Sequence, residues 1–195
     1  IFPDLAPWVL GAAVLWWAAA TFLVLTFPQS AVHWSSIATK LVIGLLILLP
    51  AWQGLVLIKA MPLGNWLIMA VMVLVWGADI GAYFSGRKFG KRKLVSPGKS
   101  WEGVFGGLLL SLLITAAVGV VRDWSASQMF AALAGAAVIV LISVVGDLTE
   151  SMFKRQAGVK DSSNLLPGHG GVLDRIDSLT AAIPVFAVLL WMAAS

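Results

Sequence analysis

SQMFAALAGAAVIVLISVVGDLT, residues 127–149, determines the fold class of this chain. It contains no charged residue before Asp147. An α-helix rises about 1.5 Å per residue, so roughly 20 apolar residues are needed to cross about 30 Å of hydrocarbon. The segment meets both requirements. We therefore predict a transmembrane helix here, with Asp147 close to one of its ends.

Segments of the same kind occur five more times along the chain. We predict further transmembrane helices at about 6–27, 38–58, 65–85, 103–121 and 175–193. Hydrophobic residues make up 60% of the 195 residues and charged residues only 11%, whereas a soluble domain carries about 25% charge. A water-soluble fold is therefore excluded. We predict an all-α, polytopic integral membrane protein with about six transmembrane helices.

The chain is predicted to form a single membrane domain over residues 1–195. Residues 1–60 form its N-terminal spans, and residues 65–193 form its core, with two long polar loops at 86–102 and 150–174. The chain starts with Ile1 rather than Met, and its first apolar run lacks the basic segment of a signal peptide, so we expect further N-terminal sequence. The chain has no cysteine, which excludes disulfides and thiolate metal sites.

The basic residues predict the orientation in the membrane. Six spans place the loops that follow the first, third and fifth spans on one side. That side collects 11 of the 13 basic residues, because only Lys59 and Arg122 fall on the other. Cytoplasmic loops carry an excess of Lys and Arg. Both long polar loops are therefore predicted to face the cytoplasm.

The first loop, GRKFGKRKLVSPGKSWEG at residues 86–103, concentrates positive charge next to a helix start. One interpretation is a polybasic patch that attracts anionic lipid, at about 1 kcal/mol per Lys or Arg. The other is a phosphate site, because a lysine, hydroxyls and free backbone N–H groups at a helix N-terminus bind phosphate. Its residues would be Ser96, Lys99 and Ser100. The spacing is not that of a Walker A motif.

Carboxylates at membrane depth form the second candidate site, because each unpaired one costs at least about 2.5–3.5 kcal/mol. Asp147, Glu150, Ser151 and Lys154 share one face of a helix. Asp174, Asp177 and Ser178 do the same at the start of the last span. Two such helix ends, joined by one loop, can converge on Mg²⁺, which takes one or two carboxylates plus substrate phosphates. Alternatively, Asp174 and Asp177 stabilise a helix N-terminus, and Asp147 pairs with a basic neighbour.

Two further polar residues allow alternatives. Asp79 lies within the third span, where it could line a polar cavity, or it could be a packing residue between Gly77 and Gly81, whose spacing allows close helix approach. Gly103 and Gly107 repeat that spacing and indicate packing. His169 could carry a proton, bind a phosphate, or be an ordinary loop histidine. With His33 in a distant loop, it does not make a zinc site.

SMFKRQAGVKDSSNLLPGHGGVLDRID, residues 151–177, resembles the signature of the phosphatidate cytidylyltransferase family of bacterial type, also called CDP-diacylglycerol synthases. About a dozen positions of this stretch match, including Lys154, Lys160, His169, Asp174 and Asp177. GDLTES at 146–151, WGADIGAYFSG at 76–86 and SPGKSWEG at 96–103 are also similar to family segments. The resemblance covers roughly residues 65–190, whereas the first 60 residues resemble the family only as membrane spans.

The resemblance implies that residues 65–193 are a catalytic core that transfers CMP from CTP to phosphatidic acid, giving CDP-diacylglycerol and pyrophosphate. It implies Mg²⁺, with a second ion of unknown identity as an option, held by Asp147 and Asp174. The implied catalytic residues are Asp147, Asp174, Asp177, Lys160 and His169. The implied substrate-binding residues are Ser96, Lys99, Ser100, Ser151, Lys154, Arg155, Arg175 and Asp79.

The resemblance also indicates partners and location. We expect CTP, phosphatidic acid and membrane lipid as partners, self-association into a homo-oligomer as an option, and no nucleic acid. The expected location is the bacterial inner membrane, with several membrane passes and an active site that faces the cytoplasm.

Two other functions involve similar residues or substrates. A CDP-alcohol phosphotransferase would use related substrates, but its D-G-x-x-A-R run is absent from the chain. An ion-coupled transporter also uses membrane acids and glycine-broken helices. It would need acids near mid-membrane and inverted repeats, whereas the acids here gather mostly at one end of the spans.

Overall fold

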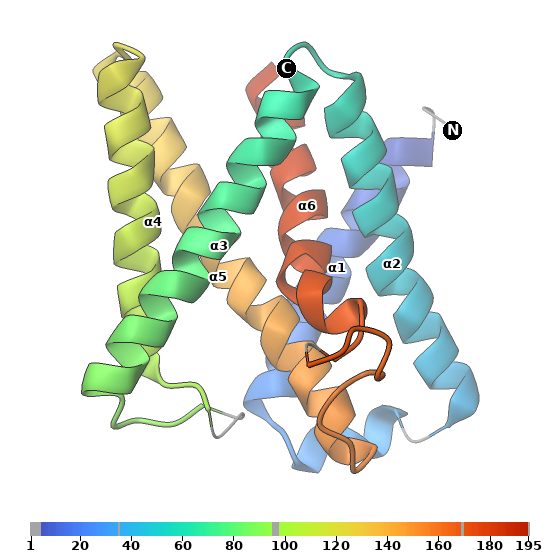
Figure 1. The fold of residues 1–195 in the computed structure, drawn as a ribbon. Helices are drawn as coiled ribbons and strands as arrows, with labels where there is room; N and C mark the ends of the chain where they lie inside the picture. Colours follow the sequence, from blue (N-terminus) through green and yellow to red (C-terminus); the bar gives the residue numbers. More distant parts are fainter. Residues whose placement is uncertain (1–4, 35, 95–97, 169, 195) are drawn as a thin grey trace.

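The computed structural model describes residues 5–34, 36–94, 98–168 and 170–194. Six long helices dominate it, and a short 3₁₀ helix, η2 (Gln29–Trp34), follows the first (Figure 1). The long helices are α1 (Ala6–Leu25), α2 (Ile37–Ala60), α3 (Gly64–Phe89), α4 (Trp101–Val121), α5 (Ala126–Gln156) and α6 (Leu173–Ala194). All six are long and apolar enough to cross a membrane. The predicted all-α, six-helix membrane fold is confirmed.

Serine side chains mark where three of these helices begin. Ser36, Ser100 and Ser125 are the N-caps of α2, α4 and α5, and each accepts a hydrogen bond from a backbone N–H in the first turn. Such caps satisfy donors that have no partner within the helix. At α5 the Gln128 side chain also accepts from the Ser125 N–H, which completes a capping box.

Two helices extend further than predicted. α3 continues to Phe89 rather than residue 85, and α5 continues to Gln156 rather than residue 149. The polar loop predicted at 150–174 therefore begins later than expected, after Gln156. Lys154 and Arg155 lie in the last turn of α5, where positive side chains interact favourably with the negative end of the helix. The two polar loops are correspondingly shorter, at 90–100 and 157–172.

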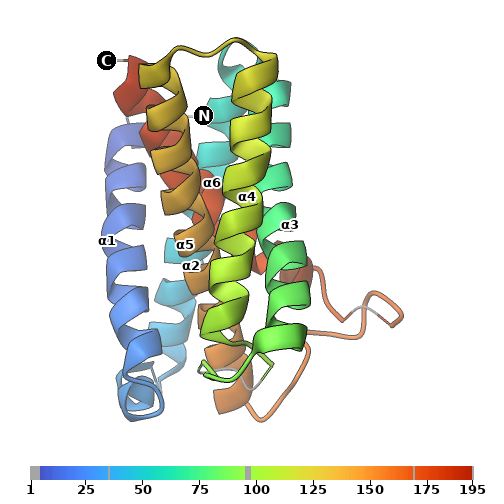
Figure 2. The same ribbon diagram turned by 90° about the vertical axis from the view of Figure 1, so that its left-hand side faces the viewer.

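Glycines allow α3 and α4 to pack backbone against backbone (Figure 2). A Cβ atom at Gly81 would lie 2.5 Å from the carbonyl oxygen of Gly106, and one at Gly107 would lie 2.5 Å from that of Ala78. No side chain fits at either position. The predicted packing role of these glycine spacings is confirmed.

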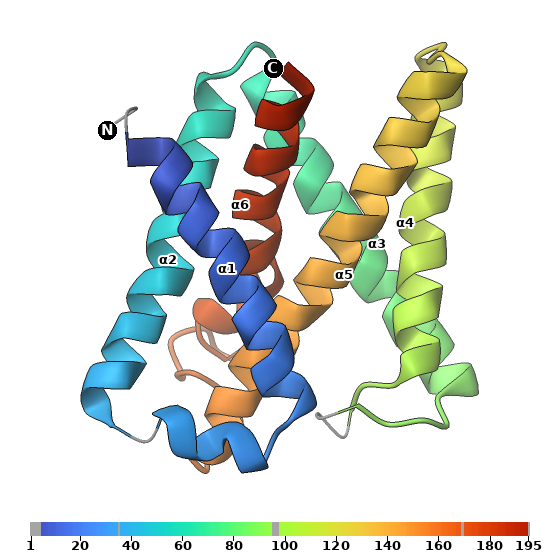
Figure 3. The ribbon, with the colours of Figure 1, turned by 180° about the vertical axis from the view of Figure 1, so that it is seen from behind.

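α6 lies between the other helices and supplies much of the buried core (Figure 3). Its small residues Ala181, Ala182 and Ala187 are almost fully buried, and they pack against α1, α2 and α5. Large apolar side chains such as Leu41, Leu45 and Phe130 are exposed on the outside. This pattern suits a bundle whose outer surface faces lipid rather than water.

Three loops lie at one end of the bundle, and 11 of the 13 basic residues lie in them or in the adjoining helix ends. Residues 26–36, 90–100 and 157–172 occupy this end, and the opposite end carries the turns at 61–63 and 122–125 and both chain termini (Figure 1). The predicted distribution of loops between the two sides is confirmed.

This arrangement gives a topological prediction. Reporter fusions near Gly90 and Gly158 should report the cytoplasm, and a fusion after Ser125 should report the opposite side, because positive loops are retained inside. A fusion after Met61 is the matched control for the opposite side. Periplasmic activity at Gly90 or Gly158 would contradict the orientation.

Candidate active site

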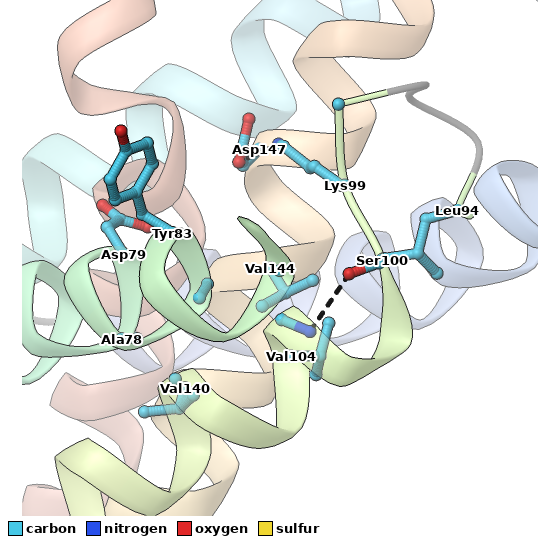
Figure 4. A pocket seen from close by; sticks show the side chains of 15 residues that line it. Ala78, Asp79, Tyr83, Leu94, Lys99, Ser100, Val104, Val140, Val144 and Asp147 are labelled. Carbon is cyan, nitrogen blue, oxygen red and sulfur yellow. Dashed lines mark hydrogen bonds and ion pairs between the residues drawn. The ribbon is translucent and has the colours of Figure 1, made fainter. Parts of the chain in front are cut away.

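A cavity of about 210 Å³ opens between α3, α4, α5 and the basic loop. Asp79 and Tyr83 come to it from α3, Lys99 from the loop and Asp147 from α5 (Figure 4). The remaining wall is mostly apolar or glycine and includes Val104, Val140 and Val144. The cavity therefore combines charged groups with surface that suits a hydrocarbon chain. Of the two alternatives for Asp79, the cavity-lining one applies.

Lys99 and Asp147 form an ion pair inside this cavity. Their side chains are 28% and 25% exposed, so both are largely shielded from solvent. Burial lowers the pKa of Lys99 to about 8, and the carboxylates of Asp177 and Asp79 oppose this shift. The charge of a partly desolvated ammonium group is screened only weakly, so such a group can bind an anionic ligand.

A short hairpin brings Lys99 to this position. The Leu94 N–H donates to the Lys99 carbonyl at 2.9 Å, and the Trp101 N–H donates to the Arg92 carbonyl at 3.0 Å. Lys93 and Ser100 form an antiparallel bridge between these two hydrogen bonds. The strand that contains Lys99 is thus held by the preceding strand of the same loop.

Ser100 has a structural position at the base of this hairpin. It is 5% exposed, and its Oγ accepts the Gly103 N–H at 3.2 Å as the N-cap of α4. It also lines the cavity. Its predicted contact with substrate stays a prediction, and the capping explains why a serine suits this position.

A second charged cluster lies where α5 ends and α6 begins. Lys154 Nζ donates to Glu150 Oε2 at 2.8 Å and to Asp174 Oδ1 at 2.5 Å. The other oxygen of Asp174 accepts from the Ser162 N–H, the Ser162 hydroxyl and the Gly171 N–H, at 2.9, 2.7 and 2.6 Å. The Asp174 side chain is only 6% exposed. Asp174 therefore fastens the 157–172 loop to both helices.

α5 and α6 approach closely beside Asp147. A Cβ at Gly146 would lie 2.8 Å from the Asp177 carbonyl oxygen and 2.9 Å from the Ala181 side chain. One turn along α5, the Glu150 carboxylate lies close to the Asp177 side chain. Glu150 Oε1 is buried and has no hydrogen-bond partner among the residues that the structure describes. The two helices thus bring the carboxylates of Asp147, Glu150 and Asp177 to one region.

The other predicted site residues are distributed as follows. Ser151 is half-buried on α5, whereas Arg155, Lys160 and Arg175 are exposed at the same end of the bundle. Ser96 and His169 lie outside the described residues. Sequence reasoning missed Glu102, which binds the backbone of the basic loop. The sequence shows it only as an acid in the first turn of the helix that follows the basic loop.

Comparison with known proteins places the chain in a family. The model of the family described as "Cytidylyltransferase family" matches residues 3–193. The chain belongs to this family. The match covers all six helices, so the cavity and both charged clusters fall within the family's domain.

Curated relatives carry one common name. The chain is 70% identical to the phosphatidate cytidylyltransferase of Pseudomonas aeruginosa, over 98% of its own length and 72% of the relative's. It is 50% identical to the phosphatidate cytidylyltransferase of Haemophilus influenzae, over 90% of its own length and 65% of the relative's. A Staphylococcus epidermidis protein of the same name is 43% identical over 63% of the chain and 48% of that protein. The chain thus spans about half to three quarters of these relatives.

Proposed function

We infer that this chain is a phosphatidate cytidylyltransferase. An oxygen of the phosphatidate phosphate attacks the α-phosphorus of CTP, the bond from that phosphorus to the β-phosphate oxygen breaks, and pyrophosphate leaves. The products are CDP-diacylglycerol and pyrophosphate. The observation that carries this inference is the 70% identity to a protein of that name over nearly the whole chain.

The geometry of the cavity supports the inference. Phosphoryl transfer depends mainly on positioning and on neutralising phosphate charge. Lys99 supplies a cation at the cavity, and Lys154, Arg155, Lys160 and Arg175 supply more at the same end of the bundle. The apolar wall formed by Val104, Val140 and Val144 provides a surface for the acyl part of a lipid. We assign Lys99 to a phosphate of CTP.

We propose that Asp147 and Asp174 hold a Mg²⁺ ion, with Asp177 adjacent. Mg²⁺ takes few protein carboxylates and completes its shell with phosphates and water, so one carboxylate from α5 and one from α6 would suffice. Glu150 Oε1, which is buried and has no hydrogen-bond partner in the described part of the chain, supports a cation at this end of the two helices. When bound, the ion would neutralise phosphate charge.

The proposed location is the bacterial inner membrane, with the cavity facing the cytoplasm. CTP is a cytosolic nucleotide, and the loops and helix ends on the cavity's side of the bundle carry 11 of the 13 basic residues of the chain. This is the side that the positive-inside rule assigns to the cytoplasm.

Purified protein should incorporate label from radioactive CTP into a chloroform-soluble product when phosphatidic acid is supplied. Chelation of divalent cations should abolish the incorporation, and added Mg²⁺ should restore it. Phosphatidylcholine in place of phosphatidic acid is the matched control, because it has no free phosphate monoester to attack CTP. Ion flux into proteoliposomes without label incorporation would support the transporter instead.

A further inference from the structure

Glu102 holds the backbone of the basic loop from the first turn of α4. Its Oε2 accepts the Lys91 N–H at 3.1 Å and the Arg92 N–H at 3.2 Å, and its Oε1 accepts the Arg92 N–H at 3.3 Å. Glu102 is half-buried and lies outside the group of residues that line the cavity. It therefore acts on the loop and does not face the cavity.

These hydrogen bonds reach the strand that holds Lys99. The Arg92 carbonyl accepts a hydrogen bond from the Trp101 N–H, and the Arg92 N–H donates to Glu102. Two residues further along the strand, Leu94 donates to the Lys99 carbonyl. Glu102 thus fixes the first strand of the hairpin, and that strand fixes the backbone of Lys99.

Gly90 shows how closely the start of the same strand packs. A Cβ atom there would meet the carbonyl oxygen of Gly86 and would lie 2.8 Å from Ser100 Oγ. The strand therefore has little room to shift between the end of α3 and the start of α4. A change at Glu102 or at Gly90 disturbs the same hairpin from two sides.

We propose that Glu102 is a positioning residue for Lys99: by binding the N–H groups of Lys91 and Arg92 it holds the hairpin in the register that places the Lys99 ammonium in the cavity. The consequence for catalysis rests on the proposed function, in which Lys99 contacts CTP. The effect on the conformation of the basic loop does not depend on the proposed function.

Two simpler roles give different expectations. If Glu102 only stabilised the positive N-terminus of α4, Asp would replace it without loss. If Glu102 acted only through its charge, its removal would raise the positive potential around Lys91, Arg92 and Lys93 and strengthen the binding of anionic CTP. The positioning role predicts weaker binding after the same removal.

Three variants separate these roles in the whole chain. Glu102→Ala removes the clamp, Glu102→Asp keeps the charge but is one methylene too short to reach the loop, and Glu102→Gln keeps the length and one acceptor oxygen. We expect Ala and Asp to raise the KM for CTP about threefold to tenfold, with Gln closer to wild type. The kcat and the KM for phosphatidate should change little. Gly90→Ala should reproduce the CTP effect.

Limited trypsin digestion in detergent provides a readout that does not depend on the reaction. Cleavage after Lys91, Arg92 and Lys93 requires local opening of the hairpin, so Glu102→Ala and Glu102→Asp should be cut faster there than wild type. Asp123→Asn, an acid-to-amide change in the turn at the opposite end of the bundle, is the control and should behave as wild type in both assays.

The outcomes are distinct. Faster cleavage with no CTP-dependent activity in any variant, wild type included, would uphold the clamp and reject the proposed function. Wild-type cleavage and KM in Glu102→Asp would overturn the positioning role in favour of helix stabilisation. A lower KM for CTP in Glu102→Ala would overturn it in favour of simple electrostatics.

Discussion

Replacing Asp147 with Asn is expected to reduce CMP transfer about 100-fold or more, while the protein still expresses and folds. Asn keeps the size of the side chain but removes the negative charge that the proposed Mg²⁺ requires. The Asp147 side chain is 25% exposed, and within the described residues it pairs only with Lys99, so little of the fold depends on it. The measurement is Mg²⁺-dependent turnover alongside thermal unfolding in detergent.

Asp174 provides an informative comparison. Asp174→Asn should lose as much activity as Asp147→Asn, and the double variant should be little worse than either, because the two residues act as a unit. The free energies of unfolding of the two single variants should differ, however. Asp174 accepts hydrogen bonds from Lys154, Ser162 and Gly171 and is almost fully buried, so its amide should also destabilise the protein by about 1–3 kcal/mol.

Asp123→Asn is the control for an acid-to-amide change and should retain full turnover. Near-normal Mg²⁺-dependent turnover in Asp147→Asn or Asp174→Asn would remove that residue from the metal site. Asp177 and Asp79 would then be the next candidates.

The helices could be predicted from the sequence because each apolar run exceeds the membrane thickness, and their number and order were correct. Their polar ends were not predicted. Apolar periodicity stops where the hydrocarbon stops, but backbone hydrogen bonding does not, so α5 continues through Lys154 and Arg155. The glycine spacings of α3 and α4 were interpreted correctly because close approach requires small residues at fixed intervals.

The candidate site was predictable in its residue types but not in its pairings. The segments that contain Asp147 and Asp174 stood out because charge at membrane depth is costly, and Lys99 stood out because it precedes a helix start together with hydroxyl groups. In the structure Lys99 pairs with Asp147, whereas Asp174 is held by Lys154 and Ser162. These pairings depend on how a hairpin and a loop fold over three helices. No short-range pattern encodes such contacts. Glu102 was missed for the same reason, since its partners are backbone groups about ten residues earlier in the chain.

Replacing Lys99 with Met is expected to raise the apparent KM for CTP roughly 10- to 100-fold, the value of one charge-assisted hydrogen bond to phosphate. The KM for phosphatidate should change much less. Met has a similar length and no charge, so the cavity is not enlarged. The effect should be large because Lys99 is held inside the cavity, where solvent screens its charge only weakly.

Lys91→Met is the matched control, because it removes the same charge from the same loop at an exposed position outside the cavity. At low ionic strength, where weak surface attraction is least screened, Lys91→Met should bind CTP nearly as well as wild type. If the two variants behave alike, or if Lys99→Met leaves the KM for CTP unchanged, then Lys99 does not bind the nucleotide. The loop would then attract anionic lipid through its total charge, and the cation that neutralises the CTP phosphates would have to come from Lys154 or the exposed basic residues beyond it.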